Sequence, residues 1–173
     1  IVSAYGTINQ CEIFNNTSRR TGGGVYLASA EIYSCRIYEN ISGTGGGGLH
    51  GGKAVNCIIT SNLTDGDGGG VLNPGGEVLN CTVYGNDAKG VGGGIHNIGR
   101  RYGTIYTSRI MNTISLINRS GDISGDLTNV SFSCFGEAGS ENQNIRANPL
   151  FLDTSGDSHS WNLQLKDGSP CID

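Results

Sequence analysis

One motif recurs four times in the first half of the chain and limits the folds that this sequence can adopt. A ten-residue segment carries cysteine at its fifth position, Ile or Val at its seventh and asparagine at its tenth. The copies are TINQCEIFNN (7–16), EIYSCRIYEN (31–40), KAVNCIITSN (53–62) and EVLNCTVYGN (77–86). Their starts lie 24, 22 and 24 residues apart. A nearly fixed period of this length is typical of architectures in which each unit stacks on its neighbours.

A glycine triplet follows each copy at a constant distance. It begins six residues after the asparagine, at 22–24, 46–48, 68–70 and 92–94, and an aliphatic residue comes directly after it. A fifth, altered copy is RIMNTISLIN (109–118), in which Thr113 stands at the cysteine position. Length varies only between the aliphatic residue and the next copy, so the insertions map to one face of the molecule.

The apolar spacing within each segment distinguishes strand from helix. Apolar positions lie two residues apart, so residues such as Leu79, Cys81 and Val83 are expected on one side of a strand. Helical repeats need spacings of three and four and a longer period, and glycine triplets would destabilise a helix. The leucine-rich repeat shares the period, but its leucine pattern is absent. The prediction is an all-β chain, a parallel β-helix (solenoid) of about five or six coils.

Equal positions in successive coils are expected to stack about 4.8 Å apart, which is the spacing of neighbouring strands. The cysteines would form an inward column of small hydrophobic side chains: Cys11, Cys35, Cys57 and Cys81. The asparagines would form a second column at a turn, with each amide bonded to its neighbours: Asn16, Asn40, Asn62, Asn86 and Asn118. Glycine is expected where the backbone needs special angles or an approach that a Cβ would block.

These residues resemble the right-handed parallel β-helix repeat proteins of the pectin-lyase-like superfamily. NCTVYGN and GGGIHN are similar to the non-enzymatic repeats of large bacterial surface and secreted proteins, including the polymorphic outer-membrane-protein type. NVSFSCFG (129–136), NIRANPLFLD (144–153) and WNLQLKDGSPCID (161–173) resemble the terminal coil and closing segment of that family. The likeness implies one domain, with regular coils over 1–118 and a terminal coil and cap over 119–173, within a longer parent chain.

The resemblance implies a structural function without enzymatic activity. The expected role is that of a secreted or cell-surface module, acting as a stalk, an adhesin or a self-stacking filament subunit. The first residues, IVSAYGTINQC, show no amphipathic helix and no charged edge. Terminal repeats normally need a cap for solubility. The uncapped first coil is therefore expected to stack on another unit, either upstream in the same chain or in a neighbouring subunit.

The alternative is a carbohydrate-binding or polysaccharide-cleaving protein, because relatives on this fold cleave polysaccharides. Such enzymes use grouped carboxylates and a basic residue. His50 and His96 directly follow glycine triplets but have no acidic partner at a matching position, and His159 lies in a polar closing loop. Asp122 and Asp126 are the nearest pair of carboxylates, in what would be an ordinary loop. Catalytic residues are therefore not expected.

Aromatic residues suggest where surface glycans would bind. Tyr38 and Tyr84 occupy the same repeat position, with Phe14 and Thr60 there in other coils. We therefore expect an aromatic stripe on the outer surface. It would either line a sugar-binding face or protect the outer surface of the sheet.

The thiols allow two states. Stacked Cα atoms lie within disulfide range, but parallel side chains keep the Cβ atoms farther apart than a relaxed bridge prefers. A reduced column is therefore favoured over pairing between adjacent coils. Cys134 and Cys171 lie outside the column and could pin the last segment to the body, a closure that would stabilise by ~3 kcal/mol. No C-x-x-C motif or Cys–His cluster indicates a bound metal.

One loop resembles a calcium site. DGDGGG (65–70) offers Asp65 and Asp67 as carboxylate ligands, whereas the equivalent loops carry no acids. No cofactor is therefore expected, with calcium as the one candidate ion. A net charge of −4 without a basic stripe argues against nucleic-acid binding. No apolar run reaches the ~18 residues of a membrane span.

Overall fold

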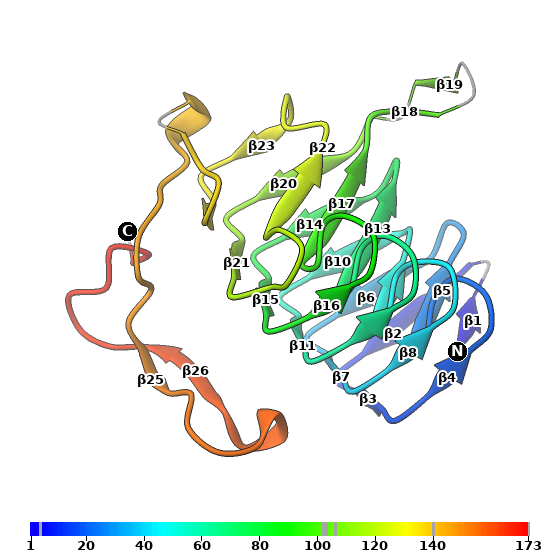
Figure 1. Ribbon diagram of the computed structural model, residues 1–173, viewed down its shortest axis with the longest axis horizontal. Coiled ribbons are helices and arrows are strands. Elements are labelled where there is room, and N and C mark those ends of the chain that lie inside the picture. Colours follow the sequence, from blue (N-terminus) through cyan, green and yellow to red (C-terminus); the bar gives the residue numbers. More distant parts are fainter. Residues whose placement is uncertain (4, 102–103, 106, 140, 173) are drawn as a thin grey trace.

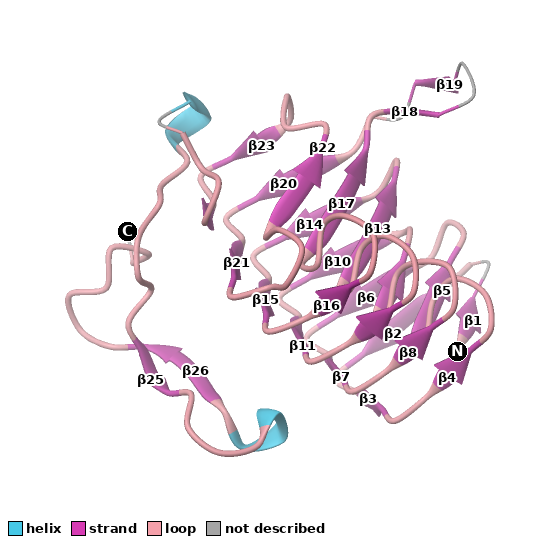
Figure 2. Cartoon of the chain, viewed as in Figure 1, coloured by secondary structure: helices cyan, strands magenta, loops and turns pink. Residues whose placement is uncertain are grey.

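The computed structural model describes residues 1–3, 5–101, 104–105, 107–139 and 141–172. It is a parallel β-solenoid of about five turns, in which short strands stack coil upon coil (Figure 1). Strands and loops make up nearly all of it (Figure 2). The prediction of an all-β parallel solenoid is confirmed.

Four stacked sheets, named A to D here, form the walls of the solenoid, and their strands pair in parallel. Sheet A contains β1 (Val2–Ser3), β5 (Val25–Leu27), β9 (Leu49–His50), β13 (Val71–Pro74), β17 (Ile95–Ile98) and β22 (Ile123–Gly125). Sheet B contains β2 (Thr7–Asn9), β6 (Glu31–Tyr33), β10 (Lys53–Val55), β14 (Glu77–Leu79), β20 (Arg109–Met111) and β23 (Val130–Ser131). Sheet C contains β3 (Glu12–Phe14), β7 (Arg36–Tyr38), β11 (Ile58–Thr60), β15 (Thr82–Tyr84), β21 (Ile114–Leu116) and β24 (Cys134–Phe135). Sheet D contains β4 (Thr17–Ser18), β8 (Ile41–Ser42), β12 (Leu63–Thr64) and β16 (Asp87–Ala88).

Each ten-residue repeat segment forms two strands rather than one. In the fourth copy β14 ends at Leu79, and Asn80, with φ of +52°, separates it from β15. This bend leaves Val78, Cys81 and Val83 buried and Leu79 partly exposed. The prediction that Leu79 shares a face with Cys81 was therefore wrong, because a left-handed residue interrupts the alternation of an extended strand.

Columns of aliphatic side chains fill the interior. Sheet A contributes the buried residues Val25, Leu49, Val71, Ile95 and Ile123. Sheet B contributes Ile32, Ala54, Val78, Ile110 and Val130, and sheet C contributes Ile13, Ile37, Ile59 and Val83. The repeat keeps these positions in register, as in the pairing of Ile13 with Ile37. Burial of apolar surface at roughly 25 cal/mol per Å² is therefore spread evenly along the solenoid.

The glycine triplets form the turn between sheets D and A. The first glycine of each triplet has φ between +62° and +69°, which side chains rarely adopt. The second glycine packs directly on backbone. A Cβ at Gly69 would collide with the carbonyl oxygens of Asp87 and Gly93. Both roles predicted for glycine are therefore confirmed.

The insertion before the fifth copy projects from the coil as an antiparallel pair, β18 (Arg100–Arg101) and β19 (Thr104–Ile105) (Figure 1). After the last coil, η1 (Glu141–Gln143) and residues 144–145 bond to β23 and β24. None of the described helices is long and apolar enough to cross a membrane.

Residues 148–172, here called the strap, run back along the outer face of sheet C. They contain β25 (Phe151–Asp153), η2 (Ser158–Ser160) and β26 (Asn162–Leu165), and β25 pairs with β26 in antiparallel fashion. Trp161 packs edge-on against Tyr84, with ring centroids 5.1 Å apart. The Oγ of Ser158 donates to Glu39 Oε1 at 2.9 Å. The strap therefore lies along the side of the solenoid, and residues 141–145 lie at its end.

Candidate functional site

The asparagines that end the repeat segments form one continuous ladder at a corner of the coil. Each Nδ2 donates to the Oδ1 of the next rung at 2.9–3.0 Å, from Asn16 through Asn40, Asn62 and Asn86 to Asn118. Each of these Oδ1 atoms also accepts the backbone N–H of the rung before it at 2.9–3.0 Å. The predicted stacking of buried asparagines is confirmed.

The remaining amide hydrogen of each rung bonds to the backbone. The Nδ2 of Asn62 also donates to the carbonyl oxygen of Ile37, and that of Asn86 donates to Ile59, both at 2.9 Å. These carbonyl groups belong to the preceding coil, so one side chain joins three levels of the solenoid. A fully buried amide has both hydrogens and its oxygen satisfied in this way, as burial of polar groups requires.

Asp122 ends this ladder. Its Oδ1 accepts the backbone N–H and the Nδ2 of Asn118 at 2.9 and 3.0 Å, and its Oδ2 accepts the N–H of Gly136 at 2.9 Å. Its own backbone N–H donates to the carboxylate of Glu137 at 3.1 Å. Burial raises the pKa of Asp122, although the hydrogen bonds from Asn118 and Gly136 oppose this rise. A carboxyl group has no N–H to donate to a further rung, so the column stops here.

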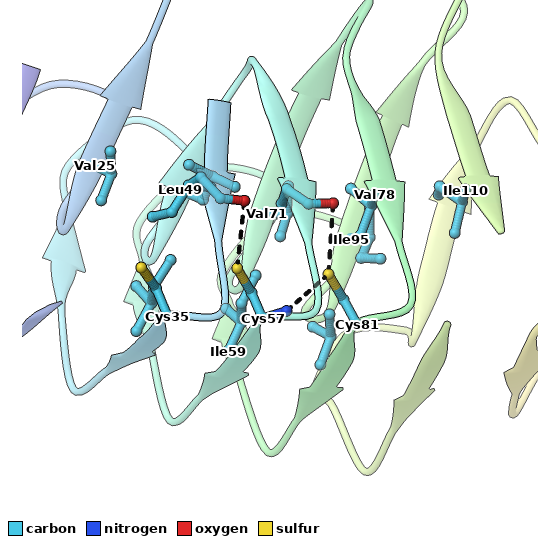
Figure 3. Packing of buried hydrophobic residues seen from close by; sticks show 14 of the residues in the cluster. Val25, Cys35, Leu49, Cys57, Ile59, Val71, Val78, Cys81, Ile95 and Ile110 are labelled. Atoms are coloured by element: carbon cyan, nitrogen blue, oxygen red, sulfur yellow. Dashed lines mark hydrogen bonds between the residues drawn. The ribbon is translucent and has the colours of Figure 1, made fainter. Parts of the chain in front are cut away.

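The cysteines form a second ladder at the preceding corner, and Cys35, Cys57 and Cys81 lie in one row (Figure 3). The N–H of Cys57 donates to the Sγ of Cys81 at 3.4 Å. The Cys81 thiol contacts the carbonyl oxygens of Leu79 at 3.2 Å and of Ala54, in the preceding coil, at 3.6 Å. The hydrogen bonds therefore follow the same plan as those of the asparagine ladder.

Other small polar side chains continue this second column. The N–H of Cys81 donates to Thr113 Oγ1, that of Thr113 to Ser133 Oγ, and that of Ser133 to Asn144 Oδ1, at 3.4, 3.2 and 3.0 Å. All six cysteines of the chain are free thiols. Burial raises the pKa of Cys81, which keeps this thiol protonated and unreactive at neutral pH.

A third, short ladder was missed by sequence reasoning. The Nδ2 of Asn73 donates to the Oδ1 of Asn97 at 2.9 Å, and the Nδ2 of Asn97 donates to the carbonyl oxygen of Asp126 at 2.6 Å. Both asparagines are buried. Each stands three residues after the end of a glycine triplet, so their shared offset was the signal that could have identified them.

Two of the three histidines lie on the outer face of sheet A. The ring of His50 stacks on that of Tyr26, with centroids 4.7 Å apart. The Nδ1 of His96 lies 2.9 Å from the Oγ of Ser124. Each ring thus has an aromatic or hydroxyl neighbour on this face.

The remaining catalytic candidates lie elsewhere. His159 belongs to the strap, where its Nδ1 is 3.8 Å from Glu39 Oε1. The Oδ1 of Asp126 accepts the backbone N–H of Thr128 at 2.9 Å, and hydrogen bonds from Thr128 lower the pKa of this carboxyl. Asp122 is occupied at the end of the ladder. The structure therefore places His159, Asp126 and Asp122 in three different surroundings.

The two carboxylates of the calcium candidate bond to other groups. Lys89 Nζ lies 2.7 Å from Asp65 Oδ1, and the hydrogen bond with Asp65 raises the pKa of Lys89. The Oδ1 of Asp67 accepts the N–H of Val91 at 3.0 Å. Within the described part of the chain, no group of three or more His, Cys, Asp or Glu could hold a metal. Calcium binding stays a prediction that this geometry does not favour.

The strap packs on Tyr84 in the predicted aromatic stripe, whereas Phe14 at the other end of the stripe stays 46% exposed. Tyr38 is only 9% exposed and stacks on Phe14, with centroids 5.0 Å apart. Tyr84 meets Trp161 and Phe151 nearly at right angles. Of the two roles expected for the stripe, this packing favours protection of the outer sheet surface over an open sugar-binding face.

Cys134 and Cys171 line the same cavity, of about 420 Å³, between the last coils and the end of the strap. Cys134 is buried, with its Sγ 3.3 Å from the carbonyl oxygen of Ala147, and Cys171 is half-buried. Burial, together with a hydrogen bond to Cys134, raises the pKa of Cys171 to about 12. The structure thus brings these two thiols together.

Fold and ladders define a parallel β-solenoid repeat protein with stacked buried asparagines. No family model matches the chain, and comparisons with curated proteins and with solved structures likewise found no match. Assignment to the pectin-lyase-like superfamily therefore stays a prediction from the motifs.

Proposed function

We propose that this chain is a non-enzymatic structural module that closes one end of a β-helical stalk and accepts a further coil at its N-terminal end. The proposal includes a secreted or cell-surface location, a right-handed coil and membership of the pectin-lyase-like class. One observation supports it most strongly. The two ends of the coil stack differ in their hydrogen-bonding chemistry.

The N-terminal end offers an unfilled acceptor. Every ladder oxygen from Asn40 to Asn118 receives two N–H groups, whereas no described residue donates to the Oδ1 of Asn16. The same coil exposes Cys11 and 46% of Phe14. An unfilled hydrogen-bond acceptor beside exposed apolar surface is what a solenoid presents where another coil stacks.

The C-terminal end is closed. Asp122 already accepts three N–H groups, and its backbone N–H is bound by Glu137. The Nδ2 of Asn144 donates to the carbonyl oxygen of Val130 at 2.9 Å, and Phe135 is 2% exposed. A second copy placed head to tail would therefore meet an end at which the hydrogen-bonding groups of Asp122 already have partners. This difference favours a stalk or adhesin module over the self-stacking filament.

An added coil would test the open acceptor. Val2 pairs with Tyr26, so a copy of residues 7–24 placed before Ile1 would complete one more turn. Its asparagine, equivalent to Asn16, would donate to the Asn16 oxygen and raise the free energy of unfolding by about 1–3 kcal/mol.

The matched control carries aspartate in place of that added asparagine, so that a carboxylate faces the Asn16 oxygen. In urea denaturation, this control should lose most of the gain in the free energy of unfolding, and its m-value should not change. Equal stability of the two extended chains, or no gain in either, would show that the Asn16 acceptor does not direct stacking.

Self-association of the chain itself can be measured by sedimentation and light scattering over a concentration series. If two copies meet at their N-terminal ends, Asn16→Arg should abolish association. Gly139→Arg alters the segment that follows β24 and should leave this association intact. The folded chain can accommodate that substitution, because a Cβ at Gly139 meets no atom within 4 Å. Polymers that both substitutions disrupt would instead establish the head-to-tail filament.

Carbohydrate binding is the second candidate, and the outer face of sheet A favours it over the face beneath the strap. Tyr26 and His50 stack there and are both partly exposed. A glycan array, with Tyr26→Ala as the variant, would detect binding. Release of unsaturated uronate from polysaccharides would establish cleavage and overturn the structural proposal.

A further inference from the structure

We propose that Cys134 and Cys171 form a disulfide that locks the strap onto the last coils, while the four ladder thiols remain reduced. The bond would join β24, in the last coil, to the end of the strap. It closes a long loop that contains both strap strands. The inference concerns the strap alone and does not depend on what stacks on the N-terminal end.

Placement of the two thiols is the first argument. Cys134 and Cys171 face one cavity, which Thr113, Ser133 and Pro170 also line. The Cys134 thiol also contributes to the raised pKa of Cys171, as expected for two thiols that face the same cavity. Cys171 is half-buried and so stays accessible to a small oxidant from solvent.

The other four thiols differ in both position and engagement. Cys35, Cys57 and Cys81 are at most 2% exposed and hydrogen-bond to backbone groups in two coils. Side chains that stack in parallel do not meet the geometry of a relaxed bridge. Cys11 is exposed, but it lies in the first coil, at the other end of the solenoid from Cys134.

Weak attachment of the strap is the second argument. Among the described strands, β25 and β26 pair with each other and not with any solenoid strand. The side chains of Leu150, Leu152 and Ile172 remain 38–51% exposed. The strap is therefore held to the solenoid by lateral contacts of Phe151, Trp161 and Ser158 and by the hydrogen bond from Arg36 to the His159 carbonyl oxygen. A segment attached in this way opens easily unless it is tied covalently.

A low-molecular-weight disulfide such as oxidised glutathione supplies the oxidising equivalents. The thiolate of Cys171 attacks one sulfur of the oxidant, forms a mixed disulfide and releases one glutathione thiolate. The thiolate of Cys134 then attacks the Cys171 sulfur and releases the second glutathione. The two protein thiols lose two protons and two electrons, and one molecule of oxidised glutathione is reduced to two molecules of glutathione.

Peptide mapping of the full chain tests the pairing directly. Trypsin cleaves after Arg119, Arg146 and Lys166, so residues 120–146 and 167–173 become separate peptides with one cysteine each. After incubation with oxidised glutathione, these two peptides should appear covalently joined and should separate on reduction. A linkage through Cys11 or a ladder cysteine, or no linkage after full exposure to the oxidant, would overturn the proposal.

Cys134→Ser and Cys171→Ser provide the functional readout, with Cys11→Ser as the matched control. Oxidation should raise the Tm of the wild type and of Cys11→Ser by about 5–10 °C. The Tm of Cys134→Ser and that of Cys171→Ser should not change on oxidation. Because burial and the neighbouring thiol raise the pKa of Cys171, the bond should form roughly tenfold faster for each pH unit above neutrality. A gain in Tm that Cys11→Ser removes would place the reactive thiol elsewhere.

Discussion

The two corner ladders share one hydrogen-bonding plan but differ in how far their residues vary. The asparagine column keeps one residue type from Asn16 to Asn118 and ends in a carboxylate. The cysteine column passes from Cys81 to Thr113 and Ser133 without losing its N–H acceptor. Two columns of the same coil therefore place unequal demands on their side chains.

Hydrogen-bonding capacity explains the difference. An asparagine rung donates twice and accepts twice, and it bonds side chain to side chain with its neighbour. A cysteine rung needs only one acceptor atom and one weak donor, which a hydroxyl group also supplies. A column therefore tolerates substitution when each rung bonds mainly to the backbone, and does not when the side chains of successive rungs bond to one another.

The strongest test of this comparison is Asn62→Ala. The substitution removes the acceptor of the Asn40 N–H and Nδ2 groups and one donor to the Ile37 carbonyl oxygen. Because all these groups are buried, the free energy of unfolding should fall by about 3–5 kcal/mol, measured by urea denaturation.

Asn16→Ala is the matched control within the same column. Asn16 is exposed and has only one neighbouring rung, so its loss should cost roughly 1 kcal/mol or less. Similar losses at Asn16 and Asn62 would mean that ladder bonding contributes little and that local turn structure sets the preference for asparagine.

A smaller effect is expected in the cysteine column. Cys81→Ala leaves the Cys57 N–H without its acceptor and should cost about 2 kcal/mol. Cys81→Ser retains an acceptor and a donor, as Thr113 and Ser133 do, and should cost less than about 1 kcal/mol. If the two variants were equally unstable, volume rather than hydrogen bonding would determine what this column accepts.

The smallest expected effect is the pH dependence at Asp122. Burial raises the pKa of this carboxyl in the folded chain, so folding disfavours its ionised form. The stability that Asp122 contributes is fully present below its unfolded pKa of about 3.9 and decreases as pH rises through the folded value. The stability of the wild type relative to Asp122→Asn should therefore fall between acidic and neutral pH, in urea titrations. A relative stability that rises with pH would contradict the burial argument.

Repetition explains what the sequence made predictable. Residues that recur at one position stack in one column, so the asparagines, the cysteines and the close approach at Gly69 could be inferred from spacing. The corners were harder, because left-handed angles occur at residues as different as Gln10, Asn80 and Ile117. No glycine marks most of these bends, and the strands around them therefore read as continuous.

Features that occur only once in the chain could not be predicted from the spacing of recurring residues. Asp122 lies four residues after Asn118 and follows no repeat offset, so its place at the ladder end depends on how the last turn folds. The docking of Trp161 on Tyr84 depends on a chain reversal that no periodic pattern encodes. Asn73 and Asn97 are an intermediate case, because their offset is regular but only two copies exist.

The amides of the asparagine ladder all point the same way along the solenoid. Each amide group has a dipole with its negative end at oxygen, and dipoles that align head to tail add, as peptide groups do in a helix. The oxygen end of this series lies at Asn16, and the nitrogen end lies at Asp122. The ladder therefore gives the molecule an electrical polarity: the Asp122 carboxyl group lies at the positive pole, and the first coil carries a partial negative potential.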